Sequence, residues 1–210
     1  MTDVVVLDYE MSNLRSAVKA FERLDAEVTV ARSGDEVGSP AAIVLPGVGH
    51  FGEAMRRIRA AGFDKAISRA HDNGAQVLGI CLGLQLLFDR SEESPDTTGL
   101  GLIPGDVRAL STTKKLPQIG WNTVTWRDGV GLAPDEPAPH DRTYYFVHSF
   151  AVHPERQEDV LGTADYGERF CASAGRERVT GVQFHPEKSS SAGLGLLGRW
   201  LAGLKVPAAA

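Results

Sequence analysis

The amino-acid sequence predicts an α/β fold with a mixed, mainly parallel central sheet flanked by helices. Short β-branched runs alternate with longer helical runs over the first ninety residues, which is typical of strand–helix–strand units on a parallel sheet. From Gly99 onward, short strand-like pieces are separated by Gly, Pro and Asp, which indicates antiparallel hairpins. The chain has 210 residues and shows neither a linker nor an internal repeat, so we expect a single domain over residues 1–210.

The elements follow in chain order. The apolar runs of the first half predict strands at 4–7, 27–31, 41–46 and 76–80. Helices are predicted at 12–24, 51–62 and 82–90. Apolar residues recur at helical spacing in the first of them, after Ser12 and Asn13, either of which is a candidate N-cap. The second half predicts strand-like pieces at 100–110, 121–126, 142–152, 160–166 and 178–184, and a last helix over 192–204. We expect the apolar tail at 206–210 to fray.

Composition excludes several classes of function. The net charge is −5 and no block of five or six basic residues occurs, which argues against nucleic acid or a membrane surface as a partner. The first ten residues lack a basic region, and no apolar stretch reaches about 18 residues, so we expect a cytoplasmic protein. Cys81 and Cys171 lack metal-binding spacing and are not expected to form a disulfide.

The thiol of Cys81 has the surroundings of a nucleophile. The pentapeptide 79–83 reads G-x-C-x-G, the thiol counterpart of the nucleophile elbow of α/β-hydrolases. A nucleophile on a sharp strand-to-helix turn needs small neighbours, because the two chain segments pass closely there. The start of a helix also favours a thiolate and supplies amides for an oxyanion. A buried structural cysteine is the alternative interpretation of this pentapeptide.

One histidine is the best candidate for a proton-transfer partner. His185 ends an apolar strand, Pro186 stops that strand, and Glu187 lies two residues further on, where its carboxylate can hold the imidazole. In isolation, His-Pro-Glu is also typical of a solvated turn. Together with the elbow, these residues predict a Cys–His–Glu triad that converges at the carboxyl ends of neighbouring strands.

A glycine-rich turn follows the strand at 41–46. The stretch LPGVGHF at 45–51 brings backbone amides close to a ligand, and an amide of Gly47, Val48 or Gly49 can join that of Leu82 in an oxyanion hole. A plain strand–helix turn is the alternative. Neither GxxxxGK[ST] nor GxGxxG occurs, which argues against nucleotide binding.

These motifs together carry a resemblance to a known family. LPGVG, GICLGLQLL and GVQFHPEKSS resemble the class I, triad-type glutamine amidotransferases. DYEMSNLRS, RSEES, PQIGWN, YFVHSF and ADYG narrow the resemblance to the glutaminase subunit of imidazole glycerol phosphate synthase. The similar stretches run in matching order from about residue 7 to 191, which leaves no room for a synthase domain in this chain.

The resemblance implies a flavodoxin-like glutaminase that passes ammonia to a separate (β/α)₈ cyclase subunit. That cyclase makes imidazole glycerol phosphate and aminoimidazole carboxamide ribonucleotide in histidine biosynthesis. Cys81 is implied as the nucleophile, His185 as the acid and base, and Glu187 as the orienting carboxylate. No metal or cofactor is expected. The implied glutamine contacts are Gln85 and the backbone of Gly47, Gly49, His148, Ser149 and Phe150, and the implied oxyanion donors are Leu82, Val48 and Gly49.

The resemblance also implies a surface for the cyclase. Its candidates by motif position are Asn13, Trp121, Asn122, Tyr145 and Lys188, although core packing is an equally good explanation for the two aromatic residues. The chain departs from many relatives at Gln118, Leu84 and His50. Three alternatives remain at this point: the glutaminase subunit of another amidotransferase, a stand-alone γ-glutamyl thiol hydrolase, or a binding module without catalysis.

Overall fold

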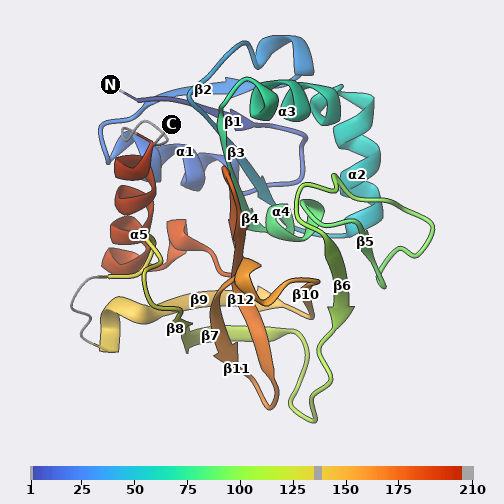
Figure 1. Cartoon of the computed structure of the whole chain (residues 1–210), viewed down its shortest axis with the longest axis vertical. Helices are drawn as coiled ribbons and strands as arrows, with labels where there is room; N and C mark the ends of the chain where they lie inside the picture. Colours follow the sequence, from blue (N-terminus) through green and yellow to red (C-terminus); the bar gives the residue numbers. More distant parts are fainter. Residues whose placement is uncertain (1, 135–138, 205–210) are drawn as a thin grey trace.

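The parallel half of the sheet forms the centre of the molecule (Figure 1). The computed structural model describes residues 2–134 and 139–204. In spatial order, the parallel strands are β2 (Glu27–Ala31), β1 (Asp3–Leu7), β3 (Ala42–Gly47), β4 (Gln76–Cys81) and β13 (Val179–Val182). If these five strands are numbered 1 to 5 along the chain, their spatial order is 2-1-3-4-5, which is that of flavodoxin-like sheets. Because β13 comes from the far end of the chain, it brings residues after 182 beside those after 80.

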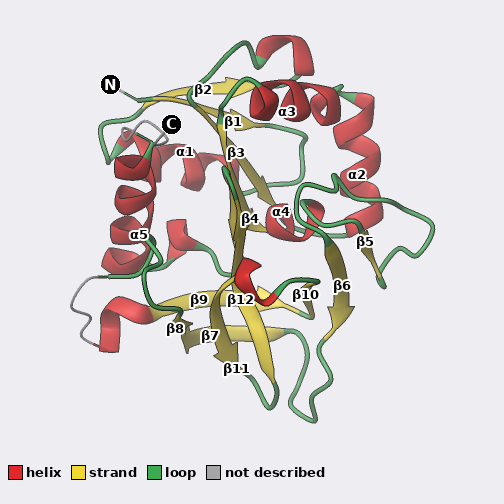
Figure 2. Ribbon diagram, viewed as in Figure 1, coloured by secondary structure: helices red, strands yellow, loops and turns green. Residues whose placement is uncertain are grey.

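Antiparallel strands extend the sheet beyond β13 (Figure 2). The extension runs from β12 through β10 and β6 to β5, with β11 paired to β12 and β8 paired to β11, and β7 and β9 form a separate ribbon. The pair β5–β6 is parallel. The bounds are β5 (Arg90–Ser91), β6 (Gly105–Ala109), β7 (Gln118–Thr123), β8 (Thr125–Trp126), β9 (Thr143–His148), β10 (Phe150–Pro154), β11 (Val160–Asp165) and β12 (Arg169–Arg176). The predicted α/β fold with a mixed sheet is confirmed.

Helices cover both faces of the parallel strands (Figure 2). One face carries α1 (Leu14–Glu22) and α5 (Ser190–Gly203), and the other carries α2 (Phe51–Ala60), α3 (Phe63–Asp72) and α4 (Leu82–Leu86). Short 3₁₀ turns occur at η1 (Gly34–Glu36), η2 (Pro139–Arg142), η3 (Gln157–Asp159) and η4 (Pro186–Lys188). In the described part of the chain, no helix combines the length and apolarity that crossing a membrane requires.

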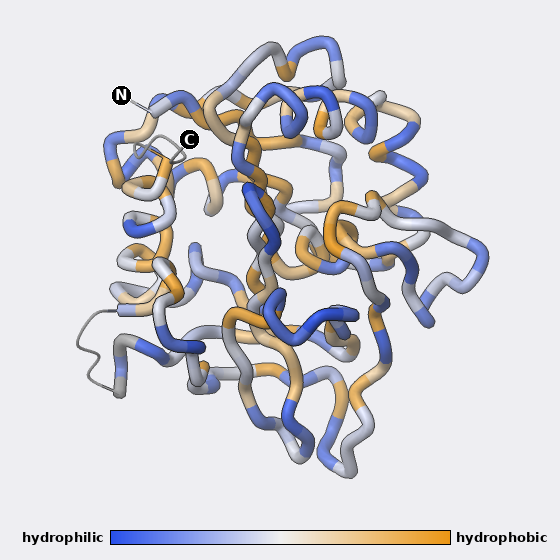
Figure 3. Tube along the Cα trace, in the orientation of Figure 1, coloured by the Kyte–Doolittle hydropathy of each residue, from blue (hydrophilic) through white to orange (hydrophobic). Residues whose placement is uncertain are grey.

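Side-chain alternation along the strands builds two cores. Val4 and Val6 of β1 pack in the cluster that contains Phe21 of α1 and Trp200 of α5, whereas Val5 packs on the opposite side of the sheet. Successive strand residues point to opposite faces, so a strand covered on both sides is apolar at every position. Figure 3 accordingly shows hydrophobic colours along the central strands.

The predicted helices differ from the observed ones in three places. Asn13 is the N-cap of α1, but its side chain makes no capping hydrogen bond. The helix predicted over 82–90 is wrong beyond Leu86, because the chain leaves α4 and the Asp89 amide bonds to the carbonyl of Gly105. Helix α3 was not predicted, although its buried residues at 63, 66, 67 and 70 have helical spacing. The tail at 206–210 lies outside the described residues.

Two glycines allow α4 to lie directly against the strands that carry it. A Cβ built on Gly83 would lie 1.8 Å from the carbonyl oxygen of Leu45 on β3, and one on Gly79 would lie 2.7 Å from the backbone of Gly83. Backbone atoms cannot move aside as a flexible side chain can. The G-x-C-x-G pattern is therefore required by the packing of α4 on β3 and β4.

We predict that Gly83→Ala lowers the free energy of unfolding by at least about 2 kcal/mol, because the added methyl group collides with backbone. Gly198→Ala is the matched control, since its nearest neighbour is a leucine methyl at 3.7 Å. In the interior of α5 this exchange should stabilise the protein by about 0.5–1 kcal/mol. Urea unfolding followed by circular dichroism measures both values. A Gly83→Ala protein as stable as the wild type would contradict the close packing of α4.

Candidate active site

Three neighbouring strands deliver the candidate residues to one edge of the sheet. Gly47 at the end of β3 is paired in register with Cys81 at the end of β4, and β4 is paired with β13, three residues before His185. The carboxyl ends of parallel strands in open α/β sheets are where ligands bind. The fold therefore brings the predicted thiol, imidazole and glycine-rich turn together, although more than a hundred residues separate Cys81 from His185 in the sequence.

Cys81 lies in a strained backbone conformation. Its φ of 57° and ψ of −112° fall outside the regions that L-residues normally occupy. Such strain persists only where the surrounding structure fixes it, here through the close contact of α4 with β3. The Cys81 side chain is 6% exposed, and its sulfur lies 3.7 Å from Nε2 of Gln183 and 3.8 Å from the carbonyl oxygen of Val147.

His185 and Glu187 form a buried pair beside the thiol. Nδ1 of His185 lies 2.8 Å from Oε1 of Glu187, and each side chain is 4% exposed. Burial by itself lowers the pKa of this histidine, but its hydrogen bonds to Cys81 and Glu187 outweigh that effect and raise the pKa to about 10. The imidazole is therefore held as a cation between a sulfur and a carboxylate.

Backbone bonds fix the position of this histidine. The His185 amide donates to the carbonyl of Tyr145 at 2.9 Å. The hydroxyl of Ser189 donates to the His185 carbonyl at 2.6 Å and accepts from the Tyr145 amide at 2.9 Å. Strand β9 and the turn after β13 thus clamp the segment that carries the imidazole.

A cavity of about 270 Å³ opens in front of the sulfur. Most of the residues that the sequence predicted as glutamine contacts or oxyanion donors line it, as do both the thiol and the imidazole. Gly47 does not line the cavity, because this residue is buried. The lining residues are Val48, Gly49, Cys81, Leu82, Gln85, Glu93, Pro117, Val147, His148, Ser149, Phe150, His185 and Lys188.

The glycine-rich turn has only part of the predicted oxyanion geometry. Leu82 is the first residue of α4, so its N–H is one of the amides that a helix leaves unpaired. The Val48 N–H, in contrast, donates to the carbonyl of Met11 at 2.8 Å and is not free for a ligand in the cavity. Gly49 has a φ of 102°, a conformation that favours glycine, so the turn can change its conformation at that residue.

Two buried residues behind the turn were not singled out from the sequence. The Tyr9 hydroxyl lies against Gly47 and has no hydrogen-bond partner among the described residues, and burial raises its pKa. Gln183 is fully buried between Cys81 and Gln85. A signal for Gln183 was present, because residues two apart on a strand point to the same face and Gln183 precedes His185 by two.

His148 is a structural histidine on the wall of the cavity. Its Nδ1 lies 2.9 Å from the Phe150 carbonyl oxygen and its Nε2 lies 3.0 Å from the Gln118 side-chain amide. Burial lowers its pKa to about 4, so the ring is neutral. A neutral ring donates through one nitrogen only, and the Phe150 carbonyl requires that donor to be Nδ1. Gln118 therefore presents its amide nitrogen, and not its oxygen, to Nε2 of the ring.

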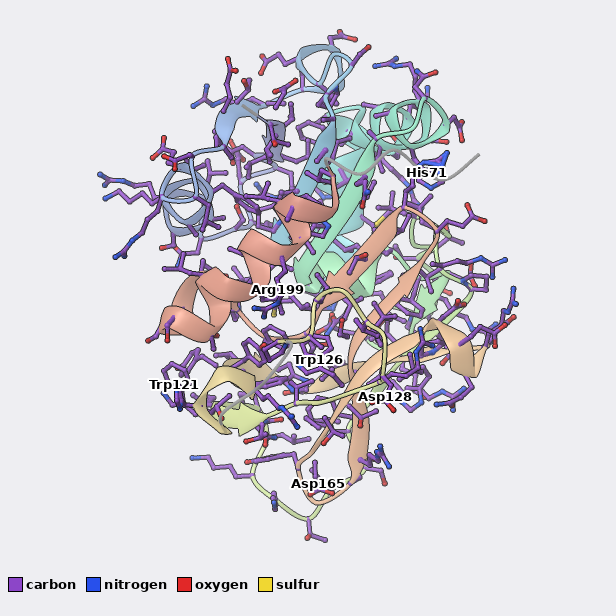
Figure 4. All side chains as sticks on the ribbon, turned by 60° about the vertical axis from the view of Figure 1, so that its left-hand side comes forward. His71, Trp121, Trp126, Asp128, Asp165 and Arg199 are labelled. Carbon is purple, nitrogen blue, oxygen red and sulfur yellow. The ribbon has the colours of Figure 1, made fainter. Side chains whose placement is uncertain are left out.

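The candidate partner residues have different surroundings. Trp121 is 55% exposed and Ile119, two residues away on the same face of β7, is 63% exposed. Figure 4 shows Trp121 at the margin of the molecule. Its ring packs edge-on against Tyr145, with centroids 5.9 Å apart. Asn13 and Lys188 are exposed, whereas Asn122 is half-buried and donates to the Asp165 carbonyl. Core packing thus does not account for Trp121.

In the two described ranges, no three His, Cys, Asp or Glu side chains cluster closely enough to hold a metal ion. Cys171 lies away from the cavity, and burial raises the pKa of its thiol to about 12. It behaves as a small buried side chain, in contrast to Cys81.

We predict a pH dependence of stability that comes from His148. The unfolded chain binds a proton on this ring below pH 6.5, whereas the folded ring resists protonation down to about pH 4. Folding is therefore weakened as the pH falls through this window, by on the order of 3 kcal/mol. Urea unfolding between pH 7 and 4 should show this loss in the wild type and a smaller one in His148→Gln. Parallel curves for the two proteins would contradict the assignment.

Comparisons with known proteins agree on one family. A family model described as Glutamine amidotransferase class-I matches residues 5–197. A protein of Moorella thermoacetica named imidazole glycerol phosphate synthase subunit HisH is 43% identical over 94% of this chain and 93% of its own length. The protein of the same name from Chlorobaculum tepidum is 43% identical over 92% of this chain and 96% of its own.

Solved structures share the fold at low sequence identity. A structure described as PurLQS from Thermotoga maritima superposes with a TM-score of 0.76 at 20% identity, over 97% of this chain and 99% of that chain. A structure described as a glutamine amidotransferase gives a TM-score of 0.70 at 20% identity, over 95% and 98%. The chain therefore belongs to the class-I glutamine amidotransferases and, within them, to the HisH subunits of imidazole glycerol phosphate synthase.

Proposed function

We propose that this protein hydrolyses glutamine to glutamate and ammonia, and that it delivers the ammonia to a (β/α)₈ cyclase subunit. That subunit makes imidazole glycerol phosphate and aminoimidazole carboxamide ribonucleotide. The observation that carries the proposal is the His185–Glu187 pair, 2.8 Å apart, at a cavity that also contains the strained Cys81. Relatives that are 43% identical over nearly their full length favour this function over another amidotransferase or a stand-alone hydrolase.

The first half-reaction forms a thioester. The Cys81 thiolate adds to the side-chain amide carbon of glutamine, and the carbonyl oxygen takes the negative charge. The Leu82 amide and an amide of the 47–49 turn hold that oxygen. His185 donates its proton to the departing nitrogen, which leaves as ammonia. Glu187 binds Nδ1 of the ring and so keeps the Nε2–H group directed at the substrate.

The second half-reaction regenerates the Cys81 thiolate and the protonated His185. His185, now neutral, takes a proton from water, and the resulting hydroxide attacks the thioester carbon. The carbon–sulfur bond breaks, glutamate leaves, and the thiolate again faces a protonated imidazole. Every proton is returned, so the cycle needs no external reagent except water.

Gln85 is proposed to hold the amino-acid end of glutamine. Its Nε2 donates both hydrogens, to the Phe150 carbonyl at 3.1 Å and to Oε1 of Gln183 at 3.0 Å. The remaining polar atom is Oε1, an acceptor that suits the α-ammonium group of glutamine.

The cyclase is proposed to dock on the surface that carries Trp121. This residue and Ile119 expose large apolar side chains on β7, and Lys188 lies at the rim of the cavity. Exposed aromatic residues are enriched at the centres of protein interfaces. Docking beside the cavity would also allow ammonia to pass between the subunits without reaching bulk water.

The proposal predicts different fates for the two thiols. Cys81→Ala should reduce glutamate release by a factor on the order of 10³ or more, because the nucleophile is lost. The matched control Cys171→Ala should retain the wild-type rate, since that thiol is buried away from the cavity. A coupled glutamate dehydrogenase assay measures both. Full activity in Cys81→Ala would exclude the proposed chemistry.

A second prediction concerns the oxyanion turn. The Val48 amide is bonded to Met11, so the isolated chain is missing one proposed donor. Loss of one such donor typically costs about 10²–10³ in rate. We therefore expect glutamate release to rise by about two orders of magnitude when the cyclase subunit and its nucleotide ligand are added. Equal kcat values with and without the partner would show that the turn does not limit the rate.

A further inference from the structure

Gln183 lies directly beside the reactive sulfur. Strand β13 pairs with β4 in parallel register, Val182 opposite Ile80, so the next residues along the two strands are Gln183 and Cys81. Gln183 has no exposed surface. Its Nε2 lies 3.7 Å from the sulfur of Cys81, within the range of a hydrogen bond to sulfur, and its Oε1 lies 3.0 Å from Nε2 of Gln85.

The surrounding bonds fix the orientation of this amide. The Phe150 carbonyl can only accept a hydrogen bond, so the group that Gln85 presents to it must be the amide nitrogen. That same nitrogen is the atom nearest to Gln183, which must therefore present its oxygen to Gln85. The nitrogen of Gln183 then has to face Cys81. A backbone carbonyl thus determines, through two side chains, that the sulfur receives a donor.

A fixed N–H donor beside sulfur favours the thiolate over the thiol. Hydrogen bonds to a charged group are stronger than those between neutral groups, and burial strengthens them further. His185 also stabilises the thiolate, but its proton moves to ammonia and is regained from water in each cycle. The Gln183 amide does not titrate, so its donor remains in place through both half-reactions.

We propose that Gln183 is a further catalytic residue, whose side-chain amide stabilises the Cys81 thiolate both as the attacking group and as the leaving group. This inference rests on the proposed glutaminase chemistry. It assigns to Gln183 a direct contact with the reacting atom, in addition to its bond with Gln85.

The test compares two substitutions. Gln183→Met keeps the volume of the side chain and removes both polar groups. Gln183→Glu keeps an oxygen that can accept from Gln85, but it replaces the donor to sulfur with a negatively charged carboxylate. Gln118→Met is the matched control, because Gln118 is also a buried amide of this region and bonds to His148 instead of Cys81. Circular dichroism establishes that each protein is folded.

The readout is the rate at which iodoacetamide alkylates Cys81 between pH 5 and 10, with the site identified by peptide mass spectrometry. We expect the pH of half-maximal rate to rise by about one unit in Gln183→Met, a tenfold loss of thiolate at lower pH. It should rise further in Gln183→Glu, because the new carboxylate also repels the thiolate. It should not change in Gln118→Met. With the cyclase present, kcat for glutamine should fall about tenfold in both Gln183 variants. If Gln183→Met does not fold, Gln183→Leu provides the same comparison, because it also removes both polar groups without adding a charge.

An unchanged pH of half-maximal alkylation in a folded Gln183 variant would overturn the inference. If the KM for glutamine were raised in that variant, the role of Gln183 would be to position Gln85 for substrate binding. Alkylation requires no glutamine turnover. Failure of wild-type protein with its partner to release glutamate would instead contradict the proposed function, so the two failures are distinguishable.

Discussion

The contact of α4 with the backbone of β3 is the constraint on which the site depends. Gly83 brings the helix so close to the Leu45 carbonyl that no side chain fits between them. The chain must then turn from β4 into α4 within one residue, and that residue is Cys81 with its positive φ. The strain at Cys81 and the missing side chains at Gly79 and Gly83 have the same cause. Together they hold the sulfur at the end of the sheet, at the first turn of a helix.

A connected set of buried polar groups surrounds that sulfur. It runs from the Phe150 carbonyl through Gln85 and Gln183 to Cys81, and His185 and Glu187 continue it on the other side. Buried polar groups are costly unless they are paired, and each pairing here restricts the orientation of the next group. The network therefore positions the reactive atoms and also fixes which of them donate.

The turn at 47–49 is the less constrained part of the site. Its Val48 amide is satisfied by Met11, outside the cavity, whereas the residues of the proposed triad are held by β9, β13 and α4. Val48 and Gly49 are both exposed, so a bound partner can contact the turn directly. Under the proposed function, a rigid nucleophile and an adjustable oxyanion donor would keep glutamine hydrolysis slow until ammonia is needed.

The sequence by itself determined the elements with strong periodicity and the residues whose chemistry is local. The alternating runs predicted the parallel strands β1 to β4, but β13, which is also parallel to β4, lies in the half that was predicted to be antiparallel. G-x-C-x-G and His-Pro-Glu pointed to the proposed triad, because each pattern depends on neighbours within a few residues. Helix α3 had the same kind of signal and could have been predicted from it. Tertiary structure alone decided the rest. The end of α4 at Leu86, the direction of the Val48 amide and the place of Gln183 beside Cys81 all depend on segments far apart in the chain, and strand register and backbone packing bring those segments together.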